Sequence, residues 1–74
     1  MINVRDGKLL KRFGKHLRTT RKDASITQEE LANGADIPLS QIGRIERGEI
    51  NATLSTLNAL AAALKIPLHK LMNF

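Results

Sequence analysis

The stretch TQEELANGADIPLSQIGRIERG, from Thr27 to Gly48, contains two short helical patterns with few residues between them. Thr27 is a favourable N-cap, and Glu30 three residues later completes a capping box, so a helix begins after Thr27. Pro38 disfavours helix at Ile37 and suits the first turn of a new helix. We therefore predict one helix that ends before Ile37 and a second from about Pro38 to Gly48, which is a good C-terminal stop.

The second of these helices has two different faces. Ile42, Ile45 and Glu46 share one side of a helical wheel, and the isoleucines require a core. The other side therefore faces outward, beginning at the first turn, and carries these residues: Leu39, Ser40, Gln41, Arg44 and Arg47. A short helix that presents polar side chains from its first turns is suited to reading a DNA major groove.

Glu46 lies on the buried side, where an unpaired carboxylate is costly. Arg21 offers a partner, because it falls on the apolar stripe of the preceding helix and not on its basic face. We predict an Arg21–Glu46 ion pair that joins the two helices. The alternative is that Glu46 tilts to the helix edge and reaches water.

The rest of the chain is also helical in pattern, which gives an all-α fold with five helices. The first helix is predicted from about Arg5 to Lys22, and Gly14 on its apolar stripe suggests a close approach by another helix. Thr53 caps a fourth helix and Pro67 opens a fifth. The fourth helix is expected to turn these residues inward: Leu54, Leu57, Leu60, Ala61 and Leu64.

The charge is unevenly distributed. Residues 1–22 carry eight Lys or Arg against one acid, or +7, whereas residues 23–74 carry four against six, or −2, for a net +5. A basic end favours a polyanionic partner, although a solvated helix face remains an alternative. The only aromatic residues are Phe13 and Phe74, so stacking on unpaired bases has little support.

The composition argues against several other classes of protein. The 74 residues include no cysteine, no paired His and carboxylate at a useful spacing, and no glycine-rich phosphate loop, so we expect no enzyme and no cofactor. His16 and His69 lie far apart without a third ligand, so we expect surface residues and no metal. Because there is neither a signal-peptide core nor an apolar run long enough for a membrane, we expect a cytoplasmic protein.

Together these segments resemble the Cro/C1-type helix-turn-helix family, also called the XRE family. The similarity rests on LRTTRKDASITQEELA, SQIGRIERG and TLSTLNALAAALKIPLHKLM. It implies a five-helix, lambda-repressor-like DNA-binding domain over residues 17–72, with residues 1–16 as the N-terminal part of an extended basic first helix. One departure is Asp36, which stands where the family usually has the turn glycine; Asp tolerates a left-handed conformation better than most residues.

The resemblance also implies the site residues. The recognition helix, residues 38–47, would enter the major groove and contact bases through Leu39, Ser40, Gln41 and Arg44. Phosphates would be contacted by Gln28, Arg47, Arg18 and Lys22, and Arg21 and Glu46 would form the structural ion pair. Independently, Arg suits guanine and Gln suits adenine. Gln28 as an ordinary first-turn residue and Leu39 as a core residue remain alternatives.

The expected function is a sequence-specific double-stranded DNA-binding transcriptional regulator, with repression as its activity. A palindromic operator and a homodimer are expected, and no small-molecule ligand. The dimer would form through the apolar residues left near the C-terminal end, which are Ile50, Leu68, Leu71, Met72 and Phe74. The extension of the first helix is the rival surface. The alternative is an antitoxin-like or protein-interaction module, against which the polar outer face argues.

Overall fold

The structure, a computed structural model, describes residues 4–74. These residues form five α-helices and no strands: α1 Gly7–Asp23, α2 Gln28–Ala35, α3 Leu39–Glu46, α4 Leu54–Ala63 and α5 Leu68–Leu71. The predicted all-α, five-helix architecture is confirmed for this part of the chain. Within residues 4–74, no helix combines the length and the apolarity needed to cross a membrane.

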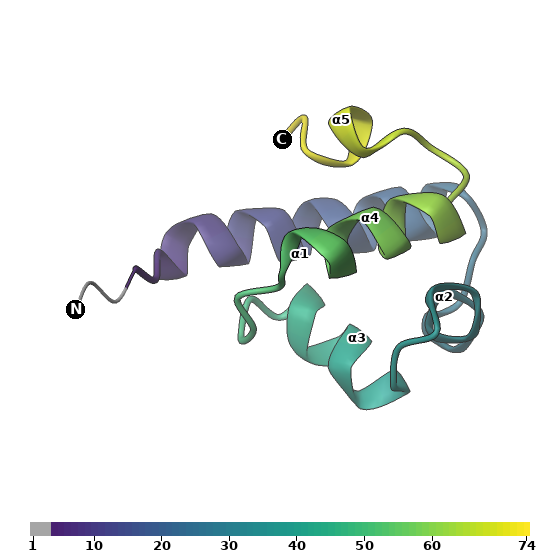
Figure 1. The fold of residues 1–74 in the computed structure, drawn as a ribbon, viewed down its shortest axis with the longest axis horizontal. Helices are drawn as coiled ribbons and strands as arrows, with labels where there is room; N and C mark the ends of the chain where they lie inside the picture. Colours follow the sequence, from purple (N-terminus) through teal and green to yellow (C-terminus); the bar gives the residue numbers. More distant parts are fainter. Residues whose placement is uncertain (1–3) are drawn as a thin grey trace.

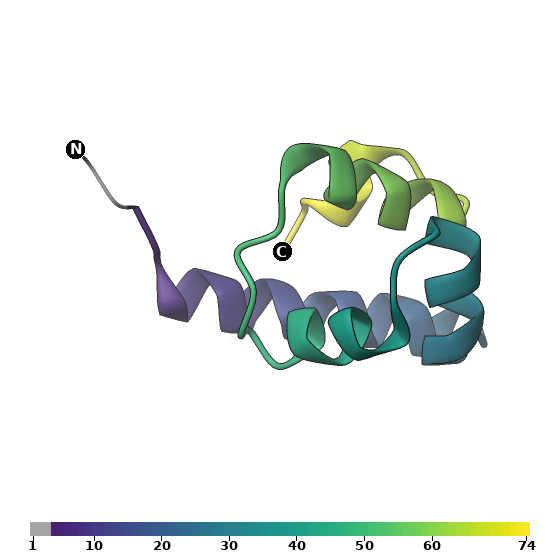
Figure 2. The same cartoon turned by 60° about the horizontal axis from the view of Figure 1, so that its bottom comes forward.

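The helices surround one core (Figure 1). The longest helix, α1, packs against α3 and α5, while α2 packs against α3 and α4. In Figure 2, α1 and α3 lie on one side of the core, α4 and α5 lie on the other, and α2 closes one end. The helix α3 therefore packs against both the long α1 and the preceding α2.

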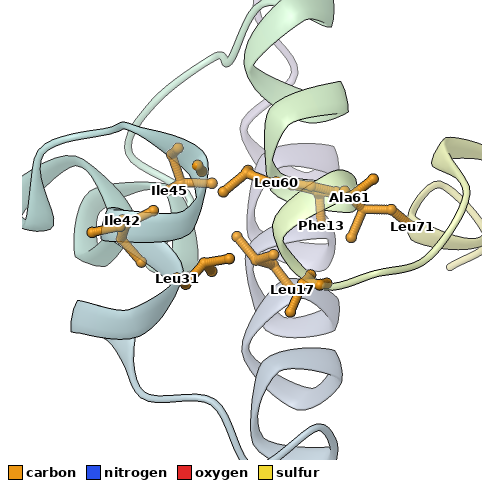
Figure 3. Packing of buried hydrophobic residues seen from close by; sticks show 11 residues of the cluster. Phe13, Leu17, Leu31, Ile42, Ile45, Leu60, Ala61 and Leu71 are labelled. Atoms are coloured by element: carbon orange, nitrogen blue, oxygen red, sulfur yellow. The ribbon is translucent and has the colours of Figure 1, made fainter.

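The core draws side chains from every helix (Figure 3). Its largest fully buried members, each less than 2% exposed, are Leu17, Leu31, Ile42, Ile45, Leu60 and Leu71. Burial of a leucine or isoleucine side chain contributes about 1.5–3 kcal/mol, so these residues supply much of the free energy that holds the helices together.

The helix ends follow local sequence signals. Thr27 accepts from the Glu30 backbone N–H while the Glu30 side chain accepts from the Thr27 N–H, so the predicted capping box is present. The start of α1 differs from the prediction of Arg5. Asp6 caps this helix by accepting from the Leu9 N–H at 3.0 Å, so α1 begins at Gly7. Asp36 adopts the left-handed conformation, φ 56° and ψ 48°, that its place in the turn requires.

Gly14 allows the close approach of α1 and α3 that the sequence suggested. A Cβ at Gly14 would lie 2.4 Å from the backbone oxygen of Glu46. Gly48, with φ +75°, makes a second close contact, because a Cβ there would lie 2.7 Å from the Cα of Lys11. The C-terminal half of α3 and the residue that ends it are thus held directly against the backbone of α1.

Two predictions about surface and core are wrong. Leu54, expected to face inward, is 71% exposed. The buried residues of α4, Leu60 and Ala61, lie in its second half, so the first turn extends past the core. His16, expected on the surface, is half-buried and stacks on Phe74 with ring centroids 5.7 Å apart.

The apolar residues near the C-terminal end divide into three groups. Leu71 is fully buried in the core, Ile50 and Leu68 are half-buried, and Met72 and Phe74 are 42% and 39% exposed. Phe74 also packs edge-on against Phe13, with ring centroids 5.5 Å apart. Only part of the predicted dimer surface is therefore free.

Candidate nucleic-acid interface

The outward face of α3 carries the residues that the sequence assigned to bases. Leu39, Ser40 and Arg44 are exposed and Gln41 is half-buried, whereas Ile42, Ile45 and Glu46 are buried. Leu39 is 46% exposed, which rules out the alternative of a core residue. Contact between these side chains and bases remains a prediction.

The start of α3 lacks a side-chain cap, because Pro38 occupies the N-cap position. The first N–H groups of any helix have no intrahelical partner, and they carry the positive end of the helix dipole. The start of α3 therefore offers backbone donors and a positive potential beside Leu39 and Ser40. Both properties suit an approach to negatively charged DNA.

Arg21 and Glu46 lie together in a buried, two-pronged ion pair. The Nε of Arg21 donates to Oε2 of Glu46 at 2.6 Å and its Nη2 donates to Oε1 at 3.1 Å. A third N–H, on Nη1, donates to the Ile26 carbonyl at 2.9 Å. The side chains are only 8% and 3% exposed, so nearly every polar atom must be paired within the protein.

Gln28 is a further member of this network, beyond the predicted pair. Its Nε2 donates to Oε1 of Glu46 at 3.0 Å. Each amide nitrogen has two N–H groups, so one remains for a ligand such as a phosphate oxygen. The buried pair thus fixes the first residue of α2 relative to α3. The only signal in the sequence was that Gln28 begins α2 and Glu46 ends α3.

A groove of about 560 Å³ brings three of the predicted phosphate residues together with Leu39, one of the four predicted base residues. It is lined by α1, α2 and α3, and includes Arg18, Gln28, Leu39 and Arg47. Lys22 lies one turn beyond Arg18 and is exposed, but it does not line the groove. Three of the four residues expected at phosphates therefore border one cavity beside the recognition helix.

Glu49 lies beside two exposed arginines, Arg44 of α3 and Arg47 directly after it, and nothing in the sequence indicated this contact. Its Oε2 accepts from Nε of Arg47 at 2.7 Å, and its Oε1 lies 3.6 Å from Nε of Arg44. The hydrogen bond from Arg47 lowers the pKa of the Glu49 carboxyl, and the same bond raises the pKa of Arg47. Each arginine approaches Glu49 through its Nε, so the N–H donors on its Nη atoms remain for a ligand.

The chain matches known proteins over most of its length. A helix-turn-helix family model matches residues 17–71. The immunity repressor protein of Bacillus phage phi105 is 42% identical over 53 residues, which cover 72% of this chain and 37% of the repressor. Control protein C.SmaI of Serratia marcescens is 40% identical over 60 residues, covering 81% of this chain and 71% of C.SmaI.

A solved structure agrees with both sequence matches. The restriction-modification controller protein C.AhdI from Aeromonas hydrophila superposes with a TM-score of 0.82 and 36% identity, covering 89% of this chain and 98% of C.AhdI. The fold is therefore lambda-repressor-like, and the chain belongs to the Cro/C1-type helix-turn-helix family. This is a family of DNA-binding transcription regulators.

Proposed function

We propose that the protein is a sequence-specific double-stranded DNA-binding regulator of transcription, with repression as its activity. The observation that carries the proposal is the outward face of α3, where Ser40 and Arg44 are exposed and Leu39 lines a groove together with Arg18 and Arg47. Two relatives, the phage immunity repressor and the HTH-type transcriptional repressor RghR of Bacillus subtilis, are named as repressors. The alternative, a protein-interaction module, would be better served by an apolar α3 face.

The proposed contacts follow from the geometry of the site. With α3 in the major groove, Leu39, Ser40, Gln41 and Arg44 face base edges, and Arg44 pairs with guanine O6 and N7. The groove beside them receives the phosphate backbone. Arg18, Gln28 and Arg47 border this groove, and Lys22 lies further along α1. In the proposed complex all four residues contact phosphates.

Replacing Arg44 with Ala tests the proposed reading of bases. We expect a loss of about 1–3 kcal/mol in binding to a preferred duplex, together with relaxed preference at one base position. Arg44 is exposed, so the fold should not change. Binding would be measured by fluorescence anisotropy against duplexes selected from a random pool by the wild-type protein.

Lys70→Ala is the matched control, because Lys70 is an exposed cation on α5. It should leave base preference unchanged. Equal loss on every duplex for Arg44→Ala would mean that Arg44 meets only phosphate. A wild-type protein that selects no duplex from the pool would overturn the proposed function as a whole.

We also propose that two copies bind a palindromic operator. One recognition helix reads only a few base pairs, too few to specify a site among ~10⁶ or more competing sequences. A two-fold dimer doubles the information and places its half-sites about 34 Å apart. The candidate surface is an apolar groove of about 110 Å³, lined in part by Leu9, Leu57, Met72 and Phe74.

Met72→Glu tests this assembly, because it places a charge in the apolar groove. In sedimentation experiments, the wild-type protein should bind a palindromic duplex as two cooperative protomers, and Met72→Glu should lose the cooperativity. Asn33→Glu, at an exposed position on α2, should retain it. Binding of a single wild-type protomer per palindrome at saturation would exclude the dimer.

A further inference from the structure

Five cations form a straight line along α1. Lys8, Lys11, Lys15, Arg18 and Lys22 are separated by three, four, three and four residues, which places them on one side of a helix. All five are exposed. In the part of the chain that the structure describes, none of them lies within ion-pair distance of a carboxylate. We call this feature the α1 basic line.

Two contacts fix the α1 basic line relative to the proposed DNA surface. Arg18 lines the groove that also contains Gln28 and Arg47. Lys11 lies against Gly48, the residue after Arg47, because a Cβ added at Gly48 would come within 2.7 Å of the Lys11 Cα. The loop after α3 crosses α1 near the N-terminal end of this helix (Figure 2). The line therefore begins beside one end of α3 and passes its other end.

The line is longer than the major groove of B-DNA is wide. Fourteen residues separate Lys8 from Lys22, or about 21 Å at 1.5 Å per residue. The major groove of B-DNA is about 12 Å wide. With α3 in the groove, a line of this length can reach from one phosphate backbone to the other. Arg18 and Lys22 then lie beside one backbone, and Lys8 and Lys11 lie beside the opposite one.

We propose that Lys8 and Lys11 bind phosphates of the DNA strand that borders the loop after α3, so that α1 bridges both walls of the major groove. The inference rests on the proposed placement of α3 in the major groove. Both lysines lie in the N-terminal half of α1 and precede residues 17–71, which the family model matches. A phosphate contact is independent of base sequence.

The test is the salt dependence of binding by the double variant Lys8→Gln, Lys11→Gln. Gln at position 11 retains the Cγ that lies close to Gly48, and Gln is a good helix former, so the fold should persist, as thermal melting by circular dichroism would show. Each lost phosphate contact reduces the slope of log K against log salt by about 0.9. We expect a reduction of about 1.8 for the pair.

The two duplex probes are one selected by the wild-type protein from a random pool and one of unselected random sequence. Affinity should fall by the same factor on both, with base preference unchanged. The control Lys65→Gln, Lys70→Gln removes the same charge from the C-terminal end and should leave the slope unchanged. The proposal would be overturned if the salt slope of Lys8→Gln, Lys11→Gln equalled that of wild type, or if both double variants changed the slope equally. Either result would leave the proposed function standing, provided that the wild-type protein still selects a duplex from the random pool.

Discussion

Replacing Glu46 with Ala is expected to destabilise the protein by about 3–5 kcal/mol, because it leaves a charged guanidinium buried without its partner. Arg21 is only 7% exposed, and two of its N–H donors point at the Glu46 carboxylate. Gln28 would also lose the acceptor for its Nε2. The loss would appear as a lower midpoint in urea unfolding, and binding to DNA should weaken because the ends of α2 and α3 are no longer held together.

A double-mutant cycle isolates the interaction. Arg21→Met and Glu46→Ala should each destabilise strongly, whereas the double variant should be far more stable than the sum of the two losses predicts, because neither charge is then stranded. Glu29→Ala, at an exposed position in the first turn of α2, is the control and should change stability little. An interaction energy near zero would show that the pair does not hold the helices together.

Gly14→Ala is expected to destabilise the protein even though Ala is the better helix former by about 1 kcal/mol. The new Cβ would lie 2.4 Å from the Glu46 carbonyl oxygen and 2.5 Å from that of Ile45. Both atoms belong to the backbone, so α1 and α3 must move apart. Overpacking of this kind costs about 1–3 kcal/mol, occasionally more.

Gly7→Ala is the matched control, because a Cβ at Gly7 meets nothing within 4 Å. It should be neutral or slightly stabilising in the same unfolding experiment. Gly14→Ala should also weaken binding to a selected duplex, since α3 can no longer seat against α1. Stability of Gly14→Ala equal to that of Gly7→Ala would mean that the helices pack less closely than the structure shows.

Local sequence was sufficient to predict the helices and the inner and outer faces of α3. The capping box at Thr27 and the break at Pro38 act within a few residues, so their effect does not depend on the rest of the fold. Periodicity alone separated Ile42 and Ile45 from the exposed Arg44. Glu46 falls on the buried side of α3 and Arg21 on the apolar stripe of α1, and a buried charge needs a partner. The sequence alone was therefore sufficient to predict their ion pair.

The tertiary structure decided whatever depends on how far one helix extends past another. Periodicity places Leu54 on the inner stripe of α4, yet no core lies opposite that turn. Similarly, nothing local indicates that Leu71 is buried while Met72 is exposed. The bonds of Gln28 to Glu46 and of Glu49 to Arg47 depend on the angle between α2 and α3 and on the path of the loop after Gly48. These are long-range properties, because they arise from the simultaneous packing of all five helices and not from the residues next to them in the chain.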